Sequence, residues 1–139
     1  MNIIRILLNM ASLKELTKEQ KYSVYIFMEE YDKSIHGNHL INPVGFYIRY
    51  DVGWDEIRKF RDNIKEDERF SYAISVLKDV HNERLFRVLL DDCYNMLKDM
   101  IQYLGIEYYM KEYPKLLELF KNEFGYDHTP LSEILPDFL

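Results

Sequence analysis

The strongest constraint on the fold is an apolar stripe with helical spacing that runs from Glu83 to Leu104. About 22 residues of helix reach roughly 33 Å, the width of a small domain, so we expect this helix to be the central element. Its opposite face carries polar side chains that include Asn95 and Lys98, and Gly105 follows as a stop. The stripe consists of Phe86, Leu89, Cys93, Met96, Leu97, Met100, Ile101 and Leu104.

Similar apolar spacing predicts further helices on both sides of this segment. Thr17 and Gln20 have the form of a capping box, with a hydroxyl at the N-cap and an amide three residues later. Pro114 suits the first turn of a helix that Gly125 ends. The expected helical segments are 17–37, 54–64, 70–80 and 114–125.

Residues 44–52 resist the helical interpretation. They are β-branched, aromatic and loosely alternating between Pro43 and Gly53, which is typical of a strand. The Ile-rich start of the chain is the one candidate partner strand, so either the two pair or residues 44–52 are helical. We therefore expect a mainly α protein, a single-domain helical bundle of five or six helices, with or without one short β-hairpin.

The length of 139 residues and an apolar share of 47% fit one globular domain over residues 1–139. Met10 is an alternative start, so residues 1–10 are expected to be a loosely attached extension. The apolar run after Met1 is too short for a membrane span, which needs about 20 apolar residues, and lacks a signal-peptide cleavage site. With Cys93 as the sole cysteine, these features predict a cytoplasmic protein without membrane contact.

The charge of the chain is acidic and uneven. The net charge is −6, with 11 Lys and Arg against 12 Asp and Glu in residues 1–70, and 7 against 12 in residues 71–139. An acidic balance disfavours broad nucleic-acid binding, because that binding depends on neutralising phosphates. It fits solubility, or attraction of a basic protein partner.

His36, His39 and Cys93 are the residues to weigh for metal or nucleophilic chemistry. The two histidines flank a glycine and an asparagine, but a structural zinc site needs four ligands, which this set does not supply. Cys93 lies in the apolar stripe, where burial raises the pKa of a thiol and makes it inert. We expect no bound metal and a cysteine that belongs to the core.

Paired carboxylates offer no catalytic arrangement either. Glu29 with Glu30, and Asp91 with Asp92, are adjacent on expected helices and so point about 100° apart. We expect them on solvated faces. The sequence also lacks the glycine-rich phosphate loops and the nucleophile elbow of common enzyme families. The expectation is a protein that is not an enzyme and has no cofactor.

Residues 46–65 resemble a helix-turn-helix DNA-binding motif if residues 46–50 are helical. Val52 and Gly53 would form the turn before a reading helix. Asp51 departs from the motif, since a glycine is usual there, and two acidic residues stand where base contacts are normally made. The basic side chains that could reach DNA are Arg58, Lys59, Arg61 and Lys65.

A cluster of tyrosines beside carboxylates suggests a protein-binding surface instead. The chain has 12 Tyr, and four of them fall between residues 103 and 113, too many to share one core face. Exposed tyrosine is enriched in protein interfaces, although a tyrosine-rich core edge explains the pattern as well. The predicted partner-binding residues are Glu107, Tyr108, Tyr109 and Glu112.

From these observations we expect a non-catalytic acidic module that binds a macromolecule, most simply a protein, stoichiometrically. Small acidic modules of this kind include immunity proteins, antitoxins and phage-encoded inhibitors, an analogy of size and charge. The alternative is a DNA-binding regulator that uses residues 46–65, and an enzyme comes third. The identity of the partner and the oligomeric state do not follow from the sequence.

Overall fold

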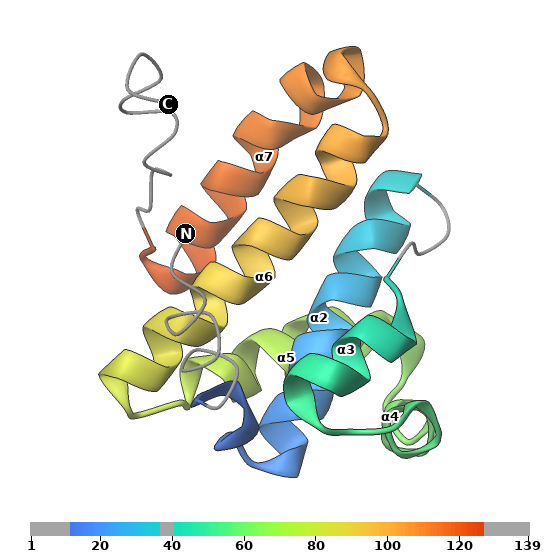
Figure 1. Cartoon of the computed structure of the whole chain (residues 1–139), viewed down its shortest axis with the longest axis vertical. Coiled ribbons are helices and arrows are strands. Elements are labelled where there is room, and N and C mark those ends of the chain that lie inside the picture. Colours follow the sequence, from blue (N-terminus) through green and yellow to red (C-terminus); the bar gives the residue numbers. More distant parts are fainter. Residues whose placement is uncertain (1–11, 37–40, 127–139) are drawn as a thin grey trace. The chain divides into compact units, whose positions relative to one another are not determined.

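The computed structural model describes residues 12–36 and 41–126, and this part of the chain is mainly α-helical and contains no strand (Figure 1). The chain divides into two compact units, residues 1–97 (unit 1) and residues 98–139 (unit 2). Each unit is described by itself. The expectation of one domain over residues 1–139, with residues 1–10 as an extension, stays a prediction, and residues 1–10 lie outside the described residues.

Helix α2 (Lys18–His36) begins at the predicted capping box. The Thr17 backbone N–H donates to Oε1 of Gln20 at 2.9 Å, and the Gln20 N–H donates to Oγ1 of Thr17 at 3.2 Å, so two end groups of the helix are satisfied. Every side chain from 23 to 29 is buried. Neighbouring elements cover all sides of α2 along residues 23–29, so α2 is the most enclosed helix of unit 1. The sequence predicts this central position for the helix at 83–104.

Helices α4 (Trp54–Asp62) and α5 (Arg69–Lys78) cover α2, with the 3₁₀ turn η1 (Glu66–Glu68) between them. Figure 1 shows α5 crossing α2, and the stacked rings of Phe27 and Phe70 have centroids 5.4 Å apart. The two helices expected at 54–64 and 70–80 are confirmed, and part of their apolar spacing lies in the core. The buried members of this spacing are Ile57, Ala73, Ile74, Leu77 and Val80.

The strand interpretation of residues 44–52 is wrong, because most of this segment forms helix α3 (Pro43–Tyr50). The Asn42 side chain accepts a hydrogen bond from the Val44 N–H at 2.9 Å, and proline occupies the first helical position. Phe46 and Tyr50 are buried one turn apart. Capping and this buried pair outweigh the β propensity of the branched residues, because β propensities span only about 1 kcal/mol per residue and depend strongly on context.

The predicted long helix exists as α6 (Glu83–Tyr103), and Gly105 follows it with φ of 115°. Residues 83–97 of α6 belong to unit 1 and residues 98–103 to unit 2. Within the stripe Leu89, Cys93, Leu97 and Ile101 are fully or almost fully buried. The period of the sequence therefore identified the helix and the centre of its core face, while Phe86, Met96 and Met100 are half-buried and Leu104 is exposed.

Helix α7 (Ile106–Phe124) starts eight residues earlier than predicted, and Gly125 ends it in the left-handed conformation, with φ of 64°. The prediction that Pro114 lies in the first turn is wrong, since Pro114 lies inside the helix. Proline has no N–H, so the carbonyl of Met110 receives no helical hydrogen bond from residue 114. Met110 and Pro114 are both exposed, and water can satisfy that carbonyl.

Candidate functional site

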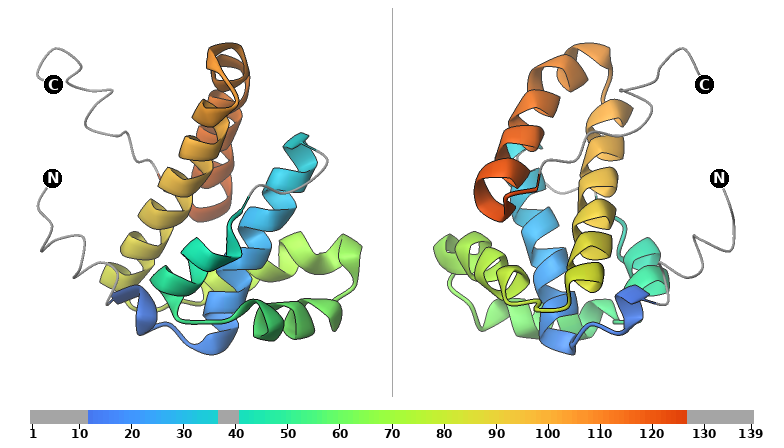
Figure 2. Two further views of the ribbon diagram at one scale, coloured as in Figure 1. Left: turned by 45° about the vertical axis from the view of Figure 1, so that its right-hand side comes forward. Right: turned by 90° about the vertical axis from the view of Figure 1, so that its left-hand side faces the viewer.

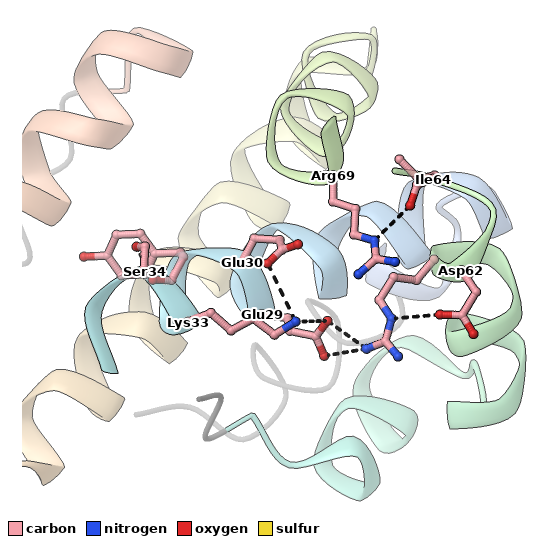
Figure 3. Close-up of polar contacts among 9 residues, drawn as sticks. Glu29, Glu30, Lys33, Ser34, Asp62, Ile64 and Arg69 are labelled. Atoms are coloured by element: carbon pink, nitrogen blue, oxygen red, sulfur yellow. Dashed lines mark hydrogen bonds and ion pairs between the residues drawn. The ribbon is translucent and has the colours of Figure 1, made fainter. Parts of the chain in front are cut away.

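The first candidate cluster is polar and buried. Glu29 on α2 is fully buried, and Nη1 of Arg61 on α4 lies 2.8 and 2.9 Å from its two carboxylate oxygens (Figure 3). Nζ of Lys33 adds contacts of 3.8 Å to Glu29 and 3.9 Å to Glu30. The expectation of a solvated face is therefore wrong at Glu29, because a partner on another helix compensates the buried charge.

Arg61 is held from a second side. Its guanidinium carbon lies 5.1 Å from the ring centroid of Trp54, within cation–π range. Burial lowers the pKa of Arg61, but the hydrogen bond and the charge of Glu29 outweigh burial, so the pKa ends above its ordinary value. An arginine whose charge is neutralised by Glu29 has a structural role, and Glu29 cannot act as an open general base.

A second buried carboxylate links α3 to α6. Asp92 is buried, and the Tyr50 hydroxyl donates a hydrogen bond of 2.5 Å to its Oδ2. The guanidinium of Arg49 forms an ion pair with the same carboxylate. The expectation of a solvated Asp92 is thus also wrong. Two donors on α3 satisfy this carboxylate, which fixes α3 against α6 within unit 1.

Cys93 lies next to Asp92 and is fully buried, as predicted. Burial raises the pKa of its thiol from 9.0 to about 12. The thiolate is the nucleophilic form of cysteine, so at neutral pH the folded protein holds almost none of it. Cys93 is a core residue.

The described residues contain no group of three or more His, Cys, Asp or Glu side chains arranged to hold a metal ion. The side chain of His36 and the whole of His39 lie outside the described residues. The absence of a metal stays a prediction there. No helix in the described part of the chain is both long and apolar enough to span a membrane.

The helix-turn-helix resemblance requires residues 46–50 to be helical, and they lie in α3. Helix α3, residues 51–53 and helix α4 form a helix, a tight turn and a second helix. Asp51, at the position where the motif usually has glycine, adopts the left-handed conformation with φ of 60° that glycine favours. Aspartate tolerates this conformation better than most residues. The departure at Asp51 therefore preserves the turn.

The four predicted DNA-binding residues do not form one open basic surface. Arg61 is paired with Glu29. Arg58 is half-exposed, and its Nη2 lies 3.4 Å from the Asp55 carboxylate, while Lys59 and Lys65 are exposed. Near the start of α4, Glu56 accepts a hydrogen bond of 2.8 Å from the Tyr22 hydroxyl. The negative charge of Glu56 would repel a DNA phosphate that approached the start of α4.

The four predicted partner-binding residues differ in their exposure to solvent. Glu107 is exposed, Tyr108 and Tyr109 are half-buried, and Glu112 is buried, with Nζ of Lys115 3.5 Å from its Oε1. The Tyr109 ring stacks on Tyr113 with centroids 4.8 Å apart. Of the four residues, only Glu107 is fully open to a partner.

Figure 2 shows the turn that connects α6 to α7. The exposed apolar side chains of unit 2 lie at this turn and in the first turns of α7, beside the predicted cluster. Tyr103 is 86% exposed, Ile106 72% and Met110 68%, and Leu104 is also exposed. Glu107 and Lys111 are exposed beside them. We call the set Tyr103, Leu104, Ile106, Glu107, Met110 and Lys111 the α6–α7 surface.

Sequence reasoning missed this surface because it did not recognise the first two turns of α7. Once Gly105 is read as a break between helices, Ile106 and Met110 fall four residues apart on one helical face. A smaller apolar group lies on α3, where Val44, Tyr47 and Ile48 are exposed at the same kind of spacing.

Comparison with known proteins adds no relative. No protein family model, no curated protein and no solved structure matches this chain.

Proposed function

We propose that this protein is a non-catalytic module that binds a protein partner through the α6–α7 surface. The observation that carries the proposal is the cluster of four exposed apolar side chains, Tyr103, Leu104, Ile106 and Met110, around one turn. Large apolar side chains gathered on a surface are characteristic of interaction sites, whereas single ones are ordinary. Tyrosine and methionine are also enriched at interfaces.

The backbone adds a specific feature to this surface. Because Pro114 has no N–H, the carbonyl of Met110, beside the exposed Met110 side chain, receives no helical hydrogen bond from residue 114. A partner donor that reached this carbonyl would add one directional contact to an otherwise non-directional patch. These two properties, apolar area and a fixed acceptor, favour a protein over a small solute.

A non-catalytic role is supported by the state of the reactive groups. Glu29 and Asp92 are compensated by Arg61 and by Tyr50 with Arg49, and the thiol of Cys93 is buried. Groups with these partners hold helices together and are poor acids, bases or nucleophiles.

We propose the same architecture, compartment and type of partner that the sequence predicts. The helices would form one bundle over residues 1–139, and the protein would act in the cytoplasm, as its single cysteine suggests. Its partner would be stoichiometric, as for an immunity protein, an antitoxin or a phage-encoded inhibitor. A basic partner fits the net charge of −6.

Affinity capture with matched variants tests the proposal. Tagged parent, Ile106→Asp and Ile48→Asp proteins are used as bait in the native host, and recovered proteins are identified by mass spectrometry. Both substitutions place a carboxylate on an exposed apolar site. We expect a partner recovered by the parent and by Ile48→Asp and lost with Ile106→Asp. Loss with Ile48→Asp alone would assign binding to α3 and contradict the proposal.

The second candidate function is DNA binding through α3 and α4, favoured by the left-handed Asp51 in a tight turn between two helices. Its test is fluorescence anisotropy with random and selected duplexes. If α4 reads DNA, Arg58→Ala and Lys59→Ala must weaken binding, and affinity must fall steeply with salt. We expect no duplex bound more tightly than about 10 µM at physiological salt, a typical non-specific value.

A further inference from the structure

Helix α7 carries two pairs of exposed residues with the same spacing. Ile106 and Met110 are apolar, and Glu107 and Lys111 have opposite charges, each pair being four residues apart. Residues four apart on a helix lie about 40° apart around its axis and one turn apart along it. The open face of α7 therefore has an apolar row and, beside it, a row that is acidic at one end and basic at the other.

Such a face is complementary to itself. A twofold axis perpendicular to two antiparallel helices brings the same flank of each helix together. A residue on the N-terminal side of the axis then faces the residue that lies equally far on the C-terminal side in the other copy. An axis midway between Glu107 and Lys111 places Glu107 opposite Lys111 of the second copy, and the reverse contact follows by symmetry. The charge order along α7 thus favours an antiparallel copy of α7.

The apolar row fits the same arrangement. An axis midway between Ile106 and Met110 places Ile106 opposite Met110 of the second copy. The midpoints of the two pairs differ by one residue, about 1.5 Å along the helix, which side chains accommodate. One axis therefore serves both pairs. Within residues 12–36 and 41–126, no ion pair joins Glu107 or Lys111 to another side chain, so both charges are open to the second copy.

We propose that the partner that docks on the α6–α7 surface is a second copy of this chain, with the two α7 helices antiparallel. The proposal rests on the proposed function, because it uses the same surface and names its partner. The partner is then an acidic chain whose opposite charges pair locally, in place of the basic partner that the net charge of −6 alone suggests. Tyr103 and Leu104 would extend the contact beyond the end of α7. A contact centred on one helical face lies at the small end of protein interfaces, so the dimer is weak and depends on concentration.

Sedimentation equilibrium of the full chain, up to about 500 µM, measures this association. The parent should dimerise, and Met110→Asp should raise the dimer Kd at least about tenfold, since the substitution enters the interface twice. Ile48→Asp, which places the same charge on α3, should leave the Kd unchanged. Circular dichroism checks that each variant is folded. A parent that stays monomeric, or a dimer that Met110→Asp does not weaken, overturns the proposal.

Charge exchange tests the register of the two helices. Glu107→Lys and Lys111→Glu should each raise the Kd by roughly three- to tenfold, because each makes one flank uniformly charged. An equimolar mixture of the two variants should regain the parental affinity, since each lysine then faces a glutamate. A mixture no tighter than either variant alone overturns the antiparallel arrangement.

The two proposals fail in different ways. If the parent is monomeric but the Ile106→Asp bait loses a partner that the parent recovers, the surface binds another protein and only the self-association is wrong. If Ile106→Asp changes neither the recovered proteins nor the dimer Kd, both proposals fall.

Discussion

Nη1 of Arg61 lies 2.8 Å from Oε1 and 2.9 Å from Oε2 of the fully buried Glu29, and this contact joins α4 to α2. Glu29 lies in the interior of unit 1, and Arg61 is partly buried, with its guanidinium carbon 5.1 Å from the ring centroid of Trp54. A charge in such a place is tolerated only because its counter-charge is fixed beside it. The residue that a DNA-binding hypothesis assigns to a phosphate is therefore part of the core of this fold.

Removing one member of this pair should destabilise the protein strongly. Arg61→Ala removes the closest counter-charge of the fully buried Glu29, which keeps only the longer contact to Lys33, and a loss of about 3 kcal/mol of unfolding free energy is expected in a urea titration. Arg58→Ala is the matched control on α4, since its pair with Asp55 is exposed, and should cost less than about 1 kcal/mol. Equal effects of Arg61→Ala and Arg58→Ala would contradict the assignment of Arg61 to the core.

The hydrogen bond from Tyr50 to Asp92 should also be visible in stability. Tyr50→Phe keeps the ring that stacks on Phe46 at 4.2 Å and removes only the hydroxyl. A loss of about 1.5–3 kcal/mol is expected, the range for a hydrogen bond to a charged group. Tyr47→Phe, at an exposed site on the same helix, should change stability by less than about 0.5 kcal/mol.

The core face of α6 is tested by Leu97→Asp. Leu97 is fully buried, so an unpaired carboxylate there should cost several kcal/mol, enough to unfold a typical domain. Asn95→Asp, on the exposed face of the same helix, should leave the melting temperature nearly unchanged. Lys98 is a poorer control, because Nζ of Lys98 lies 5.4 Å from the ring centroid of Tyr113. If Leu97→Asp melted like the parent, the core face would be misplaced.

Stability should fall at alkaline pH, and Cys93 should account for part of the fall. Its thiol pKa is raised from 9.0 to about 12 by burial. Between these values the unfolded chain has lost a proton that the folded chain keeps, so the free energy of unfolding decreases as pH rises above about 9. Tyr22 acts in the same direction above pH 10, since burial and the bond to Glu56 raise its pKa to about 12.

Urea titrations at pH 8 and about pH 10.5 measure this dependence, with roughly 1–2 kcal/mol expected from the thiol. Cys93→Ala should show a smaller fall than the parent, because it removes one of the groups that lose a proton. An identical fall in the two proteins would contradict the assignment to Cys93.

Most of the helices were predictable from local chemistry. The capping box at Thr17, the stripe of α6 and the left-handed stop at Gly125 are decided by neighbours within one or two turns. The segment at 44–52 was ambiguous because its apolar face, Phe46 and Tyr50, becomes visible only against partners from α2 and α6. The rings of Tyr25 and Phe46, for example, pack in a T-shaped arrangement with centroids 5.1 Å apart.

The buried charges were not predictable, for a different reason. Glu29 and Arg61 are 32 residues apart in the sequence, and Tyr50 and Asp92 are 42 apart. Nothing near either carboxylate signals that a distant donor will allow it to be buried. The start of α7 does not follow from the sequence, because a proline is typical of the first turn of a helix, whereas Pro114 lies inside α7 on an exposed face, where water can reach the freed carbonyl.

Site-specific photo-crosslinking in the native host tests the central claim most directly. A benzophenone amino acid replaces Ile106 on the α6–α7 surface or, as the control, Lys121, which is exposed farther along α7. A protein adduct of defined mass should form from position 106 and not from position 121. Adducts of the same yield at both positions, or a defined adduct from position 121 alone, would contradict the α6–α7 surface as the binding site.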